Sequence, residues 1–223
     1  MTTRASRSRG MPRRTAPVAA APSRTPLLLA GGIVALIAIA AVVAFALSGT
    51  TSTGLAEPAR AAVSVSGGAL PAFSDPTSDA AVGQPIPQLT GTDLSGAPIS
   101  VGPGDGPTAI VVLAHWCSHC QAEVPVLVDY LASSGMPDGV RLVAISTAID
   151  AARPNFPPSA WLDREGWTVP TLVDDASSSA LASLGVNSFP TFVFVNGEGR
   201  VVQRSTGEMP VEAFDQVVRA LAP

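Results

Sequence analysis

The stretch AIVVLAHWCSHC, residues 109–120, carries the clearest structural information in this sequence. Its first half, Ala109 to Ala114, is a short and almost continuous apolar run, which is typical of a strand buried on both faces of a sheet. Its second half places two cysteines three residues apart, where we expect a helix over residues 117–133. The pattern therefore predicts a buried strand that leads directly into a helix beginning at a pair of thiols.

Cys117 and Cys120 are the two cysteines of the chain. Residues i and i+3 in the first turn of a helix lie on one face, so the two sulfurs can bond reversibly. Cys117 stands at the helix N-terminus, where unpaired N–H groups and the helix dipole favour the thiolate. We expect Cys117 to be the attacking nucleophile and Cys120 the resolving thiol. An inert structural disulfide is the alternative, although a disulfide that closes so short a loop adds little to the stability of a fold.

Other uses of paired cysteines find less support. A structural zinc site needs four ligands, and the further soft ligands, His115 and His119, lie in the same hexapeptide, where tetrahedral geometry is poor. Haem attachment needs histidine directly after the second cysteine, where Gln121 stands. We expect no metal, and no cofactor besides a redox-active Cys117–Cys120 disulfide. A non-enzymatic Cu(I)-binding or adaptor role stays open, but no histidine follows His119.

The order of elements outward from this motif predicts the fold class. Strands and helices alternate, and the series ends in a hairpin and an amphipathic helix, which indicates an α/β fold with a mixed central sheet flanked by helices. The expected strands cover residues 86–90, 97–101, 109–114, 140–146, 169–173, 191–195 and 200–204, and the expected helices cover 117–133, part of 154–166, 176–184 and a segment from Pro210 onward.

An uncharged apolar run over residues 27–47 precedes the folded part. As a helix it would be about 31 Å long, which matches a hydrocarbon core of about 30 Å. Six arginines and no acid lie in residues 1–26. The positive-inside rule therefore predicts a single-pass transmembrane anchor with a cytoplasmic N-terminus and an extracytoplasmic domain. A signal peptide cleaved near residues 44–46 is the alternative.

The remaining boundaries follow from composition. Residues 1–26 are predicted to be a disordered basic cytoplasmic tail, residues 48–82 a flexible linker rich in Ser, Thr, Gly, Ala and Pro, and residues 83–223 one folded domain, expected to be a monomer. From residue 48 onward the chain contains seven arginines and seventeen acidic residues. This acidic balance predicts no nucleic-acid partner.

Three segments together resemble the thioredoxin superfamily, and in particular its TlpA/ResA-type membrane-anchored branch. They are WCSHCQAEVP (116–125), GQPIPQLTGTDLSGAPIS (83–100) and SFPT (188–191). The likeness covers roughly residue 83 to the C-terminus. It implies a thioredoxin-like fold and thiol–disulfide exchange with exported cysteine-containing proteins, and a membrane or extracytoplasmic partner that recharges the dithiol.

The resemblance also implies roles for individual residues. Pro190 matches a proline that is cis in these proteins, and it leaves the backbone of Phe189 free to pair with an extended substrate. Trp116 matches a residue that shields the edge of the site. Glu123 matches a carboxylate that assists proton transfer; otherwise it is an exposed acid in the first helix turn, stabilised by the helix dipole.

The sequence also departs from the thioredoxin pattern. Val111 stands where cytoplasmic thioredoxins carry a buried aspartate, which makes Glu123 the better candidate for proton transfer. His119 resembles the residue before the second cysteine in the oxidant DsbA, where a protonated imidazole stabilises the thiolate and raises the reduction potential. The resemblance to the TlpA/ResA-type branch favours a reductase, whereas His119 favours an oxidant. Alternatively, His119 is exposed and has little influence on the reduction potential. The direction, the substrate and the recharging partner stay open.

Overall fold

The structure is a computed structural model that describes residues 62–223 of the chain. The predicted tail, the predicted transmembrane helix over 27–47 and residues 48–61 of the predicted linker lie outside the described residues. Within residues 62–223 there is no helix with the length and apolar character needed to span a bilayer.

A mixed five-stranded sheet, in the order β6-β5-β4-β7-β8, forms the centre of the domain. β4 pairs in parallel with β5, and β5 in parallel with β6, whereas β7 runs antiparallel to both β4 and β8. This arrangement confirms the mixed central sheet. The strands are β4 (Thr108–Leu113), β5 (Arg141–Ser146), β6 (Thr171–Val173), β7 (Thr191–Val195) and β8 (Val201–Thr206).

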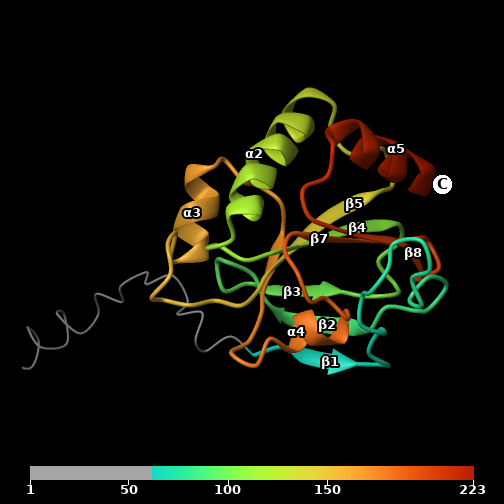
Figure 1. Cartoon of the computed structure of the whole chain (residues 1–223), viewed down its shortest axis with the longest axis horizontal. Helices are drawn as coiled ribbons and strands as arrows, with labels where there is room; N and C mark the ends of the chain where they lie inside the picture. Colours follow the sequence, from blue (N-terminus) through green and yellow to red (C-terminus); the bar gives the residue numbers. More distant parts are fainter. Residues whose placement is uncertain (1–61) are drawn as a thin grey trace, which may run out of the picture. The chain divides into compact units, whose positions relative to one another are not determined.

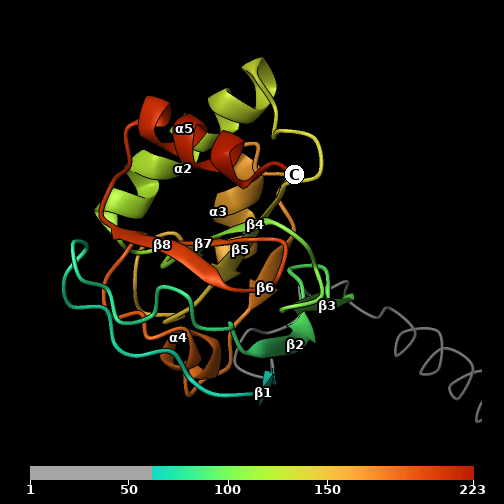
Figure 2. The same ribbon diagram turned by 90° about the vertical axis from the view of Figure 1, so that its right-hand side faces the viewer.

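Helices cover both faces of this sheet (Figures 1 and 2). The helices are α2 (Ser118–Ser133), α3 (Pro158–Arg164), α4 (Ser179–Ser183) and α5 (Val211–Leu221). A small antiparallel sheet consists of β1 (Ser64–Ser66), β2 (Gln88–Thr92) and β3 (Pro98–Val101). Helices α2, α3 and α5 lie on one face of the main sheet, and α4 lies with β1–β3 on the other.

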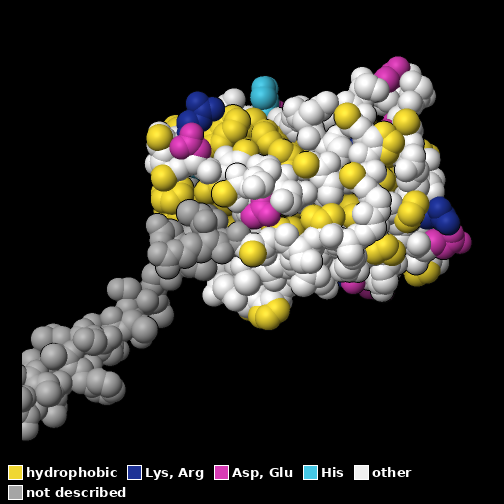
Figure 3. Space-filling model, turned by 90° about the horizontal axis from the view of Figure 1, so that it is seen from below, with side chains coloured by type: hydrophobic (Ala, Val, Ile, Leu, Met, Phe, Trp, Pro, Cys, Tyr) yellow, Lys and Arg dark blue, Asp and Glu magenta, His cyan; other side chains and the backbone are white. Residues whose placement is uncertain are grey.

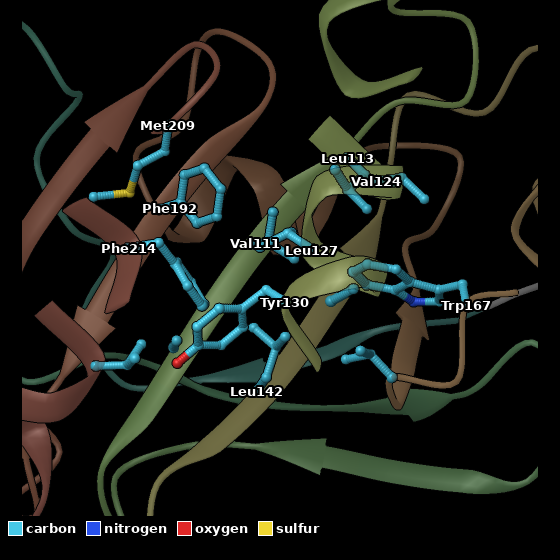
Figure 4. Packing of buried hydrophobic residues seen from close by; sticks show 14 of the residues in the cluster. Val111, Leu113, Val124, Leu127, Tyr130, Leu142, Trp167, Phe192, Met209 and Phe214 are labelled. Carbon is cyan, nitrogen blue, oxygen red and sulfur yellow. The ribbon is translucent and has the colours of Figure 1, made fainter. Parts of the chain in front are cut away.

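The predicted buried strand is the centre of the core, because all six residues of β4 are buried. Its side chains alternate between the two faces of the sheet. Val111 and Leu113 pack in the cluster beneath α2 and α5 (Figure 4), whereas Ile110 and Val112 pack toward α4 and the small sheet. Burial on both faces explains why the sequence shows a continuous apolar run rather than an apolar–polar alternation.

The described part of the predicted linker, residues 62–82, is folded onto the domain, so that part of the linker prediction is wrong. β1 pairs antiparallel with β2, and the Leu70 N–H donates to the Ser183 carbonyl at 2.8 Å. The Asp79 carboxylate forms a buried ion pair with Arg204. Backbone hydrogen bonds, one buried ion pair and the buried side chains of Leu70 and Phe73 hold this segment. A composition poor in large apolar residues does not indicate these contacts.

α4 is shorter than the helix predicted over residues 176–184. The carboxylates of Asp174 and Asp175 accept the backbone N–H groups of residues 177 and 179–181, and this local hydrogen bonding replaces the first helical turn. The C-terminal end agrees with the prediction, because Gly185 follows the helix in a left-handed conformation with φ of 64°.

Candidate active site

The two cysteines differ in their access to solvent. Cys117 is the N-cap residue of α2 and is half-buried, whereas Cys120, one turn further along, is 0% exposed. Both are free thiols, and the Ala114 N–H donates to the Cys120 sulfur at 3.5 Å. Burial, with a further contribution from the neighbouring Cys117, raises the pKa of Cys120. The site therefore holds one reachable thiol in front of one shielded thiol.

The loop before β7 lies against the reachable thiol. The Phe189–Pro190 peptide bond is cis, and the Cys117 thiol donates to the Phe189 carbonyl at 3.6 Å. The Trp116 ring meets the Phe189 ring edge-on, with their centroids 5.9 Å apart. The structure thus brings Phe189 and Pro190, which are far from the motif in sequence, against Cys117 and its neighbour Trp116.

A second loop, the β5–α3 loop of residues 147–157, forms hydrogen bonds with the side chains of His115 and Trp116, which directly precede Cys117. His115 is fully buried, with its Nδ1 2.7 Å from the Pro154 carbonyl, and its Nε2 accepts the Asp150 N–H at 3.2 Å. These partners assign the proton to Nδ1 of a neutral ring, and burial lowers the pKa of His115. The Trp116 Nε1–H donates to the Ala148 carbonyl at 2.8 Å. His115 is therefore an anchor of the active-site loop, a role that the sequence does not reveal.

Glu123 lies in the interior and is only 2% exposed, so the alternative of an exposed acid in the first helix turn is wrong. Its Oε2 accepts the Met209 N–H at 2.9 Å, while Oε1 is buried without a hydrogen-bond partner among the described residues. Burial raises the pKa of Glu123 to about 7, and the nearby Glu208 contributes in the same direction. A carboxyl group with this pKa can gain and lose a proton near neutral pH.

His119, by contrast, is exposed and has a carboxylate partner. Its Nδ1 lies 2.6 Å from Oε1 of Glu208, with side-chain exposures of 66% and 52%. Glu208 precedes the residue that binds Glu123, so one short segment touches both His119 and Glu123. The sequence gives no signal for Glu208, because it follows His119 by 89 residues.

Comparison with known proteins agrees with this arrangement. The sequence profile of the Redoxin family matches residues 81–221. The thiol-disulfide oxidoreductase ResA of Bacillus thuringiensis (strain Al Hakam) is 23% identical over 143 residues, which cover 64% of this chain and 79% of the relative. ResA of Geobacillus thermodenitrificans (strain NG80-2) is 26% identical over 108 residues, which cover 48% of this chain and 59% of the relative.

Among solved structures, a thiol:disulfide interchange protein of the thioredoxin family from Chlorobium tepidum TLS superposes with a TM-score of 0.51. It is 20% identical, and the match covers 67% of this chain and 99% of that one. At this identity the likeness supports the thioredoxin-like fold alone. Fold, family profile and relatives agree: the chain belongs to the Redoxin family and is a TlpA/ResA-like thiol-disulfide oxidoreductase of the thioredoxin superfamily.

Proposed function

We propose that this oxidoreductase reduces disulfides in exported cysteine-containing proteins, with Cys117 as the nucleophile and Cys120 as the resolving thiol. One observation carries the proposal: the reachable Cys117 thiol lies at the carbonyl of Phe189, beside the cis Pro190, with the shielded Cys120 behind it. An extended substrate segment that pairs with the backbone of Phe189 would present its sulfur to Cys117. Trp116 and Phe189 would pack against its side chains.

The reaction proceeds in two exchanges. The Cys117 thiolate attacks one sulfur of the substrate disulfide, which forms a mixed disulfide and releases the other substrate sulfur as a thiol after it takes a proton. Cys120 then loses its proton and attacks the Cys117 sulfur, which releases the second substrate thiol. The substrate gains two electrons and two protons, and the enzyme ends with a Cys117–Cys120 disulfide that a recharging partner must reduce.

Glu123 is the group that we propose accepts the proton of Cys120. The second exchange needs such a base, because burial holds Cys120 in its thiol form. The Glu123 carboxylate is close enough to raise the pKa of Cys120 further, and its Oε1 has no competing partner among residues 62–223. Its own pKa of about 7 suits a group that must both take and return a proton.

The ion pair of His119 supports the reductive direction. A protonated imidazole beside Cys117 would stabilise the thiolate and favour an oxidant. In this domain the imidazole faces the Glu208 carboxylate at 2.6 Å, and that negative charge opposes the effect of a protonated imidazole on the thiolate. The resemblance to DsbA at this single position is therefore outweighed by the likeness to the ResA-type branch.

We expect equilibration with glutathione to give a reduction potential closer to about −270 mV than to about −120 mV. Because Glu208 offsets the charge of His119, Glu208→Gln should raise the potential by about 10 to 20 mV, the equivalent of a severalfold change in the equilibrium constant. Glu212→Gln, an exposed change of the same charge in the next helix, should leave it unchanged. A wild-type value near that of DsbA, or equal values for both variants, would contradict the assignment.

The apolar run over 27–47 and the arginine-rich head support a single-pass membrane protein with its catalytic domain on the extracytoplasmic side. A membrane-impermeant maleimide added to intact cells should therefore label Cys117. Labelling that requires lysis of the cells would place the domain in the cytoplasm and exclude exported proteins as substrates.

A further inference from the structure

The six arginines of residues 62–223 differ in their partners. Five form ion pairs with carboxylates: Arg141 with Asp105, Arg164 with Glu165, Arg200 with Glu198, Arg204 with Asp79 and Arg219 with Asp215. Arg153 has no such partner among the described residues, and its guanidinium lies over the Trp116 ring, 4.3 Å from the centroid. The exception lies at the active site, in a part of the chain where sixteen acidic residues accompany these six arginines.

Arg153 is held in place by the loop that carries it. The β5–α3 loop is fixed to the motif through His115 and Trp116, and the Arg153 N–H donates to the Asp150 carbonyl at 3.1 Å. The carboxylate of Asp150, in the same loop, accepts the Ala152 N–H at 2.9 Å rather than the Arg153 guanidinium. Within the part of the chain that the structure describes, the cation is therefore exposed and unpaired beside the dithiol, with its guanidinium N–H groups available to a ligand.

Apolar side chains border this cation. The Trp116 ring contacts both Arg153 and Phe189, and the Phe189 carbonyl contacts Cys117. Phe156, in the same loop as Arg153, is 40% exposed and packs edge-on against His115. Figure 3 shows hydrophobic side chains gathered on one face of the molecule, bordered by a cationic side chain with an acidic side chain beside it and by a histidine.

We propose that Arg153 selects substrates in which a carboxylate lies within a few residues of the reacting cysteine. The guanidinium offers planar paired donors that match a carboxylate, and an apolar neighbour in the substrate would pack on Trp116 and Phe156. The other basic side chain near the dithiol, His119, already has a carboxylate partner in Glu208, so Arg153 is the group that a substrate anion can pair with. The inference rests on the proposed exchange reaction and adds the class of segment that the enzyme prefers.

Two short peptides test the proposal with purified full-length protein. Each carries one cysteine joined by a disulfide to mercaptoethanol, and they differ only in Glu or Gln at the second residue on either side of that cysteine. Attack by Cys117 and resolution by Cys120 reduce this disulfide to the peptide thiol and free mercaptoethanol, while the enzyme dithiol is oxidised. The second-order rate constant of this oxidation is measured for both peptides at low and high ionic strength.

We expect the reduced wild-type protein to react roughly twofold to fivefold faster with the Glu peptide than with the Gln peptide at about 20 mM salt, and about equally with both at about 500 mM salt. Arg153→Gln should lose the preference and react at about equal rates with the two peptides. Arg219→Gln removes the same charge on α5 and should keep the preference. Equal rates for the two wild-type reactions at low salt, or a preference that survives in Arg153→Gln, would overturn the proposal. Failure of the wild type to react with either peptide would instead overturn the exchange reaction itself.

Discussion

Cys117→Ser should reduce insulin disulfides no faster than the solution background, a loss of at least about a thousandfold relative to wild type. A hydroxyl cannot form the mixed disulfide through which exchange proceeds. The thiol that remains, Cys120, is 0% exposed and kept protonated by burial, which raises its pKa, so it cannot replace the missing nucleophile. Turbidity of the released insulin chains, followed in the presence of a reductant that recharges the enzyme, measures the effect.

The matched variant is Cys120→Ser, which keeps the attacking thiol and removes the resolving one. It should react once with substrate and then turn over slowly, as external thiol releases the product. Equal unfolding transitions of both variants and the wild type would show that the fold is intact. Turnover by Cys117→Ser at more than a few per cent of the wild-type rate would mean that Cys117 is not the nucleophile.

The second large effect concerns the buried carboxyl group of Glu123. Its pKa is about 7 in the folded protein and 4.5 for an unperturbed glutamate, so the folded state holds a proton that the unfolded state releases over this interval. The stability that this proton provides is fully present below about pH 4.5 and is lost as the pH rises through about 7. Glu123→Gln should therefore raise the free energy of unfolding by about 2 to 3 kcal/mol at pH 8, and by little at pH 4.5.

Urea unfolding at both pH values measures this difference, and Glu212→Gln, at an exposed position, serves as the control. The amide that replaces the carboxyl group in Glu123→Gln keeps a carbonyl oxygen that can accept the Met209 N–H, so the change removes charge and keeps the hydrogen bond. A wild type whose stability does not fall between pH 4.5 and pH 8 relative to Glu123→Gln would show that the folded protein does not raise the pKa of this carboxyl group.

The same substitution should also slow the resolution step. Without a base, Cys120 must lose its proton to water, and general-base catalysis is typically worth about a hundredfold to ten-thousandfold. We expect the release of substrate from the mixed disulfide to slow by at least about tenfold at pH 7 and to lose its rise between about pH 6 and pH 8. If the release rate and its pH profile are unchanged, Glu123 stabilises the site without taking the proton.

Sequence patterns predict those features of the site that depend on residues close together in the chain. The apolar run before the motif predicts β4, and the spacing of Cys117 and Cys120 predicts their placement on the first turn of α2, because both depend on neighbours within a few residues. The likeness at residues 188–191 extends this to the cis Pro190. The sequence leaves open whether Glu123 lies near the cysteines or is exposed to solvent, and the structure shows that its side chain is buried.

The remaining features depend on contacts between distant segments. Glu208 reaches His119 across 89 residues, and Arg153 reaches Trp116 because His115 ties the β5–α3 loop to the motif. No periodicity or spacing links such pairs, since loops determine where these side chains lie. The segment 62–82 fails as a linker prediction for the same reason: β1 pairs with β2, and the Leu70 and Phe73 N–H groups donate to the carbonyls of Ser183 and Gly185, which lie far along the chain.

The proposed mechanism depends most on the reachable thiol of Cys117 being the group that meets the substrate. The most direct test is mass spectrometry of Cys120→Ser after reaction with a disulfide-linked peptide, followed by digestion to locate the bond. We predict one stable mixed disulfide, with the peptide on Cys117, and no adduct in a Cys117→Ser sample treated in the same way. An adduct on Cys120 in the Cys117→Ser sample that forms as fast as the one on Cys117 would contradict this mechanism.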